Sequence, residues 1–100
     1  FLEDVLGEDL PHPSLFESLR DGVLLCRAAN IMRPGLIQQI SRRPVPFLQM
    51  ENISNFLIAA RTLGVPEAYL FSTVDLFEAK NLAQVATTLL ALARSVYQYK

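Results

Sequence analysis

The sequence is poor in the residues that build cross-linked or metal-held folds. It contains one cysteine, Cys26, one histidine, His12, and no tryptophan. A disulfide needs two cysteines and a structural zinc site takes about four ligands, so neither can hold this domain together. The glycines are isolated from one another, which leaves no glycine-rich loop for a phosphate group. The fold must therefore rest on a hydrophobic core, and we predict no metal, cofactor or nucleotide site.

The sequence also lacks a clear excess of either charge and has no long apolar run. Nine Lys and Arg stand against ten Asp and Glu, which gives a net charge of -1, whereas a protein that binds nucleic-acid duplexes carries a basic excess. The longest uncharged stretch, residues 81–93, includes Asn, Gln and two Thr, and a bilayer span needs about 20 apolar residues. We therefore predict neither nucleic-acid binding nor a membrane span.

The sequence does contain enough apolar material for one core. Of its 100 residues, 51% are hydrophobic and 19% are charged, which predicts a single folded domain over residues 1–100. The chain opens on Phe1 and soon reaches acidic residues, without the basic start of a signal peptide. We interpret it as a fragment of a longer protein, and its lone reduced thiol favours a cytoplasmic location.

The net charge hides an uneven distribution along the chain. Residues 1–21 carry six acids against Arg20, residues 22–50 carry four arginines and no acid, and residues 51–100 balance four against four. In the acid-free part, the candidate partner-binding group is Arg33, Arg42 and Arg43, in a stretch with no regular period. Two other interpretations stay open. The arginines are a solvated loop without a partner, or the oppositely charged segments fold against one another.

Apolar residues at spacings of three and four predict helices along the first third of the chain. Residues 1–6 show this spacing without a preceding cap, so we predict a truncated first helix. Ser14 and Glu17 form a capping box before a short helix. Asp21 is a candidate N-cap for residues 23–32, which are apolar on nearly all sides. A helix of that kind is predicted to be central in the fold.

Two further long helices are predicted in the second half of the chain. An apolar stripe over residues 50–63 ends at Gly64, and Pro66 starts one more turn. Asn81 with Gln84 caps a long, largely buried helix that continues to about residue 96.

No segment shows the alternation of a β-strand, and residues 36–46 contain two prolines and no period. The predicted class is therefore all-α, with about four main helices and one or two short ones.

No arrangement of residues predicts catalysis. A nucleophilic Cys26 needs a base, and His12, the single imidazole, lies between two prolines on a predicted loop. Cys26 is instead predicted to be a buried, inert thiol on the most apolar helix. Asp4 and Glu8 are spaced for one helix face, but exposed acidic faces are far commoner than catalytic carboxylate pairs. We predict that the protein is not an enzyme and has no catalytic residue.

The aromatic side chains are predicted to fill the core. They stand beside other apolar residues, whereas base-stacking platforms interleave aromatics with arginine. The phenylalanines in question are Phe16, Phe47, Phe56, Phe71 and Phe77. At the centre of the core we expect one cluster made by Leu25, Phe56, Leu89 and Leu92.

Five blocks of the sequence together resemble the calponin homology family. They are Asp21-Gly22-Val23-Leu24-Leu25-Cys26, Pro34-Gly35, Met50-Glu51-Asn52-Ile53 with Phe56-Leu57, Asp75-Leu76-Phe77-Glu78, and Gln84-Val85 with Thr88-Leu89-Leu90-Ala91-Leu92-Ala93. The blocks stand in the family's order and cover nearly the whole chain. Phe1 takes the place where the family often has Trp in its first helix. Beside the resemblance, Asp21 is suited to cap the second helix, and Gly22 lets two helices meet closely at a tight corner.

The resemblance implies a compact bundle of about four principal helices, without enzymatic activity, used for protein interaction in the actin cytoskeleton. The sequence looks closest to the single-copy type found in calponin, transgelin, Vav-type exchange factors and IQGAP proteins. We hypothesise a cytoplasmic, cytoskeleton-associated module that contributes to binding F-actin or an actin-associated protein. The alternative is an intramolecular, autoinhibitory or adaptor domain that docks on other domains of a Rho-family signalling protein, such as a guanine-nucleotide exchange factor.

Overall fold

Residue 7 and residues 14–98 are described by the computed structural model of the protein. In this part of the chain the structure has helices and loops and no strand, which confirms the predicted all-α class. The helices are α2 (Leu15–Leu19), α3 (Val23–Met32), α4 (Pro46–Thr62), the 3-10 helix η1 (Glu67–Tyr69), α5 (Thr73–Phe77) and α6 (Leu82–Gln98). The predicted helix at residues 1–6, including Phe1, lies outside the described residues, as do Asp4, Glu8 and His12.

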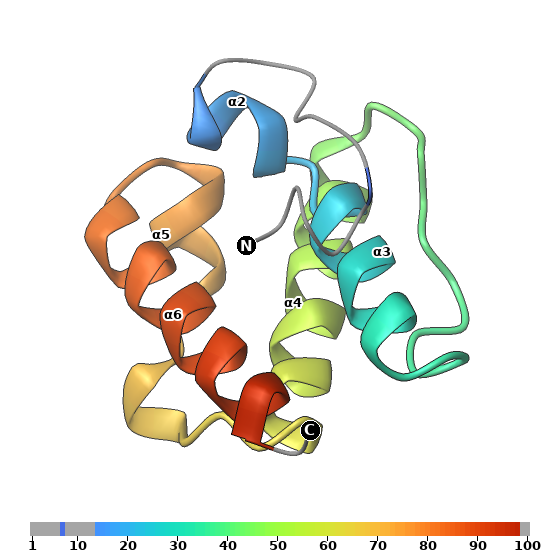
Figure 1. Ribbon diagram of the computed structural model, residues 1–100. Helices are drawn as coiled ribbons and strands as arrows, with labels where there is room; N and C mark the ends of the chain where they lie inside the picture. The colour runs from blue at the N-terminus through green and yellow to red at the C-terminus, as the bar shows by residue number, and fades with distance from the viewer. Residues whose placement is uncertain (1–6, 8–13, 99–100) are drawn as a thin grey trace.

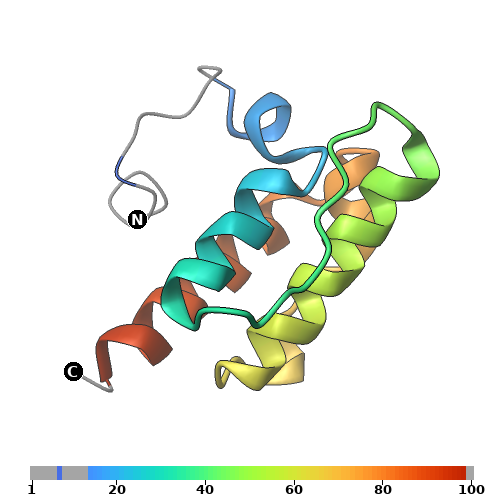
Figure 2. The same cartoon turned by 90° about the vertical axis from the view of Figure 1, so that its right-hand side faces the viewer.

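The longest helices, α3, α4 and α6, form the body of the molecule (Figure 1). α3 and α4 run in the same direction, so the connection over residues 33–45 must return from the end of α3 to the start of α4. It does so along the outside of the molecule (Figure 2). The start of α4 therefore lies at an outer corner, at the opposite end from the last turn of α3.

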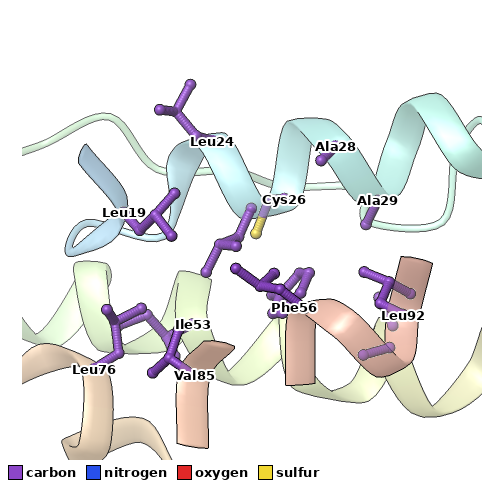
Figure 3. Packing of buried hydrophobic residues seen from close by; sticks show 14 of the residues in the cluster. Leu19, Leu24, Cys26, Ala28, Ala29, Ile53, Phe56, Leu76, Val85 and Leu92 are labelled. Carbon is purple, nitrogen blue, oxygen red and sulfur yellow. The ribbon is translucent and has the colours of Figure 1, made fainter. Parts of the chain in front are cut away.

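One hydrophobic core lies between these helices. Leu25, Phe56 and Leu92 are completely buried and Leu89 is 9% exposed, and all four belong to one cluster of buried side chains. Figure 3 shows Phe56 of α4 and Leu92 of α6 on the side of α3 that faces the core. The rings of Phe56 and Phe71 stack with their centroids 6.3 Å apart. The cluster thus joins α3, α4, α6 and the segment that precedes α5.

Three predicted helix ends are confirmed by their hydrogen bonds or backbone angles. The Ser14 hydroxyl accepts a hydrogen bond from the backbone N–H of Glu17 at the start of α2. The Asn81 side chain accepts one from the N–H of Gln84 at the start of α6, at 3.1 Å. Gly64 follows the end of α4 with a φ of 108°, a left-handed conformation that ends helices and favours glycine.

Two elements differ from the prediction. α4 begins at Pro46, inside the stretch predicted to be irregular, because a proline at the first helical position loses no hydrogen bond. Its N-cap is Val45, whose side chain cannot accept a hydrogen bond, so no polar residue marks this start. The five-residue helix α5 was not predicted, although its first turn is capped by the Asp75 carboxylate, which accepts the N–H of Ser72 at 2.8 Å.

The prediction that Phe47 lies in the core is wrong. Phe56 and Phe71 are buried and Phe16 and Phe77 are partly buried, but Phe47 is 72% exposed. The start of α3 packs against α4 at Asn52, so the first turn of α4 extends beyond the helix that would have covered it. Phe47 lies in that overhanging turn.

Candidate partner-binding surface

The candidate surface is held in place by a close contact between Gly22 and Asn52. Gly22 has a φ of 77°, and a Cβ added there would lie 2.7 Å from the Asn52 Cβ and 2.9 Å from the backbone nitrogen of Ile53. The predicted close approach of two helices at Gly22 is therefore what the geometry shows, between the start of α3 and the second turn of α4.

The predicted cap of α3 is displaced by one residue. The N-cap position is Gly22 rather than Asp21. The Asp21 carboxylate nevertheless accepts a hydrogen bond from the backbone N–H of Val23 at 3.0 Å, which satisfies the first unpaired N–H of the helix. Asp21 therefore stabilises the start of α3 from outside the cap position, because the cap itself must be a residue without a Cβ.

Asn52 connects this contact to the segment that carries two of the candidate arginines. Its side chain is 2% exposed. The Nδ2 donates to the carbonyl oxygens of Asp21, at 3.0 Å, and Ser41, at 2.7 Å, while the Oδ1 accepts from the N–H of Ser41 at 3.0 Å. Residue 41 is therefore fixed against α4, and Arg42 and Arg43 follow directly. In the sequence Asn52 stood out only as part of a family block; its position four residues before Phe56, on the buried face of α4, was the signal that could have singled it out.

Asn30 fixes the other end of the same connection. Its Nδ2 donates to the carbonyl of Ile37 at 2.9 Å, and its Oδ1 accepts from the N–H of Ile37 at 2.7 Å. The 33–45 connection is thus hydrogen-bonded to α3 near its beginning and to α4 near its end.

The three candidate arginines lie at two different places in the structure. All three are exposed, but Arg33 is the C-cap of α3 whereas Arg42 and Arg43 precede α4. They therefore lie at opposite ends of the connection (Figure 2). A cation at a helix C-terminus is favoured by the helix dipole, which gives Arg33 a structural reason for its place. Only Arg42 and Arg43 lie together.

Arg42 and Arg43 make no ion pair with any residue that the structure describes. Other basic side chains are engaged: Arg61 lies 3.8 Å from Glu67, and the guanidinium of Arg20 lies 4.2 Å from the ring centroid of Phe77. The Arg20 Nε also donates to the Phe77 carbonyl at 3.1 Å. The charge of the adjacent arginines is therefore available to a partner.

Cys26 is buried, as predicted. Its side chain has no exposed surface, and its Sγ donates a hydrogen bond to the carbonyl of Asn52 at 3.2 Å. Burial, with a smaller contribution from the negative charge of Asp21, raises the pKa of the thiol to about 12. The reactive thiolate is therefore disfavoured near neutral pH.

A second surface feature is formed by two open grooves on either side of the exposed face of α4. One, of about 360 Å³, is lined by residues 36–39 and by the α4 residues Asn55, Ile58, Ala59 and Thr62. The other, of about 310 Å³, is lined by α4 and the segment around Phe71. Both include Ile58, which is 59% exposed.

The described residues hold neither a cluster of metal ligands nor a helix that could span a membrane. No group of three or more His, Cys, Asp or Glu side chains is placed to hold a metal ion. None of the helices among these residues has the length and hydropathy needed to cross a membrane.

The fold and these surfaces define a small all-α domain with exposed arginines, exposed apolar side chains and open grooves. Its family follows from comparison with known proteins. The family model of the calponin homology (CH) domain matches residues 1–98, so the chain belongs to the calponin homology family.

Individual relatives agree with this assignment. Myophilin of Echinococcus granulosus is 47% identical over 97 residues, which are 95% of this chain and 51% of myophilin. Rac guanine nucleotide exchange factor B of Dictyostelium discoideum is 40% identical over 92 residues, which are 91% of this chain and 8% of that protein. The crystal structure of the calponin-homology domain of Rng2 from Schizosaccharomyces pombe has a TM-score of 0.87 and 30% identity, covering 98% of this chain and 63% of that chain. The chain thus spans about half the length of myophilin.

Proposed function

We propose that the domain is a non-enzymatic interaction module of the actin cytoskeleton, which contributes to binding F-actin or an actin-associated protein as part of a larger cytoplasmic polypeptide. The observation that carries the proposal is the pair Arg42 and Arg43, exposed and without an ion pair among the described residues. The pair belongs to a stretch of chain, residues 22–50, that contains no acid. Such a surface attracts the acidic surface of an actin filament, and salt screens the attraction.

Cosedimentation with F-actin tests this proposal. The domain is expected to pellet with filaments at low salt and to pellet less at about 0.5 M salt. At such a salt concentration the electrostatic screening length is only a few ångströms, so the attraction is weakened. The double reversal Arg42→Glu with Arg43→Glu is expected to weaken binding about 10-fold or more. The matched control is Lys80→Glu with Arg94→Glu, which reverses two exposed charges elsewhere. A domain that stays in the supernatant at filament concentrations of about tens of micromolar would refute direct binding.

Arg33 is tested separately, because the structure separates it from the pair. If its main role is at the C-terminus of α3, Arg33→Glu alters stability through the helix dipole and leaves filament affinity within about twofold. A loss of affinity equal to that of the double reversal would place Arg33 in the same contact after all.

One observation favours a second function, in which the domain docks on a catalytic neighbour and inhibits it. The match to Rac guanine nucleotide exchange factor B covers 91% of this chain but 8% of that protein, so this kind of domain occurs beside much larger regions there. The sequence of the complete gene product distinguishes the two functions, because the docking function requires an exchange-factor domain in the same polypeptide. If one is present, deleting residues 1–100 should raise the rate of nucleotide exchange; an unchanged rate would exclude autoinhibition.

A further inference from the structure

The start of α4 exposes apolar side chains beside Arg42 and Arg43, which pair with no acid in the described part of the chain. Phe47 is 72% exposed and Val45 is 42% exposed, and both follow Arg42 and Arg43 within residues 42–47. We call residues 42–47 the α4 corner. Phe47 is the most exposed of the large apolar side chains that the structure describes. Phe47 is not part of the core cluster, and exposed apolar side chains that lie next to charged residues are typical of interaction sites.

We propose that Phe47 is the apolar anchor of the partner-binding surface, and that it inserts into an apolar pocket rimmed by carboxylates on the partner protein. Arg42 and Arg43 then pair with the rim. This inference rests on the proposed function and deepens it, because it says what the partner must present. Binding energy in protein interfaces concentrates in a few aromatic and arginine side chains surrounded by weaker contacts, and the α4 corner supplies both kinds.

The α4 corner is held in shape before any partner binds. Asn52 fixes Ser41 through both its backbone groups, and the Ser41 hydroxyl accepts a hydrogen bond from the N–H of Arg43 at 3.3 Å. The Val45 carbonyl accepts from the N–H of Gln49 at 2.9 Å, in the first turn of α4. Pro44 and Pro46 restrict the backbone on either side of Val45. Ordering this segment on binding therefore costs little conformational entropy.

The same chemistry could meet an anionic lipid surface, but the corner is too small for that role. Segments that hold anionic membranes carry clusters of about 4–8 basic residues, and the α4 corner has two. A single acyl chain gives only marginal membrane binding, and one phenylalanine inserts far less apolar surface than an acyl chain. A protein pocket that surrounds the ring of Phe47 removes more of its apolar surface from water, so a protein partner is favoured.

The test uses the F-actin cosedimentation assay at several salt concentrations. Phe47→Ala is expected to weaken binding about 10-fold or more while leaving the salt dependence unchanged, since no charge is lost. Arg42→Gln with Arg43→Gln is expected to flatten the salt dependence. Leu90→Ala is the matched control, because Leu90 is 61% exposed on α6, away from the α4 corner. The melting temperature of Phe47→Ala should equal that of the unchanged domain.

Three other outcomes would overturn the inference, and each shows which part of it fails. If Phe47→Ala binds filaments as Leu90→Ala does, Phe47 is no anchor, and the proposed function still stands on the arginines. If the unchanged domain does not bind F-actin, direct filament binding fails and the anchor fails with it. If the unchanged domain floats with vesicles containing about one third phosphatidylserine and Phe47→Ala does not, the ligand of the α4 corner is lipid rather than a protein pocket.

Discussion

Gly22 combines a backbone angle that disfavours other residues with a lack of room for a side chain. Its φ is 77°, and the atoms nearest to an added Cβ are the Asn52 Cβ and the backbone of Asn52 and Ile53 in α4. None of them is the tip of a flexible side chain that could move aside. The contact sets how closely the start of α3 approaches Asn52, and Asn52 in turn holds Ser41. A single residue therefore supports the position of the α4 corner.

Gly22→Ala is expected to destabilise the domain more than Gly35→Ala does. Both glycines have positive φ, 77° and 80°, but an added Cβ at Gly35 meets nothing within 4 Å. Both substitutions carry the left-handed backbone cost of about 1–2 kcal/mol, and only Gly22→Ala adds the cost of overpacking, typically about 1–3 kcal/mol. Denaturant unfolding measures the difference. Equal losses of stability would show that α3 and α4 do not approach each other closely at Gly22.

The raised pKa of the Cys26 thiol makes the stability of the domain depend on pH in the alkaline range. The pKa of the thiol rises from 9.0 to about 12 on folding, so the folded state favours the protonated form. This contribution to stability is fully present below pH 9 and is lost as the pH rises toward 12. The free energy of unfolding of the unchanged domain should therefore fall relative to that of Cys26→Ala across this window. Parallel curves for the two proteins would contradict the buried, protonated thiol.

At the scale of elements, α4 joins the core to the exposed corner within one helix. Phe56 is completely buried against Phe71, and Phe47 lies in the first turn of the same helix with most of its surface in solvent. The middle of α4 therefore serves stability, and its beginning is available for binding.

Phe56→Ala and Phe47→Ala form a matched pair that tests this division. Removing the ring of Phe56 should cost about 3–5 kcal/mol, because it leaves a cavity in the core. Removing the ring of Phe47 should change stability by less than about 0.5 kcal/mol. Thermal or denaturant unfolding gives both values. A similar cost for the two would mean that the first turn of α4 packs on the rest of the domain.

Local signals were enough to predict some elements and not others. α3 was predicted with its observed bounds, Val23–Met32, because a dense apolar run lies between a turn and a proline. The start of α4 was missed because its cap is Val45, and α5 because five residues are too few for a helical period. The capping pair Ser72 and Asp75 was visible in the sequence and could have predicted α5.

The candidate surface could be predicted only in part, because distant residues assemble it. The exposure of Arg42 and Arg43 followed from their irregular surroundings. Their separation from Arg33 did not, since it depends on Asn30 and Asn52, which hold the two ends of the connection across 7 and 11 residues. The exposure of Phe47 was also hidden, because it depends on where α3 meets α4 rather than on its apolar neighbours.

At the scale of the whole molecule, the net charge of -1 says little about binding. The acid-free residues 22–50 span α3, the returning connection and the first turn of α4, and this part of the backbone lies along one side of the molecule (Figures 1 and 2). Arg42 and Arg43, which form no ion pair within residues 14–98, lie near the end of that stretch together with Phe47, the most exposed phenylalanine of the described residues. Two kinds of binding side chain thus meet at the corner where α4 begins.

Hydrogen exchange of the domain with and without F-actin is the sharpest test of the α4 corner as the contact, because it locates the contact without a substitution. We predict slower exchange of backbone amides in residues 41–49 when filaments are present, and little change in the segments that line the two grooves beside Ile58. Protection confined to those grooves or to α6, with residues 41–49 exchanging as in the free domain, would contradict it.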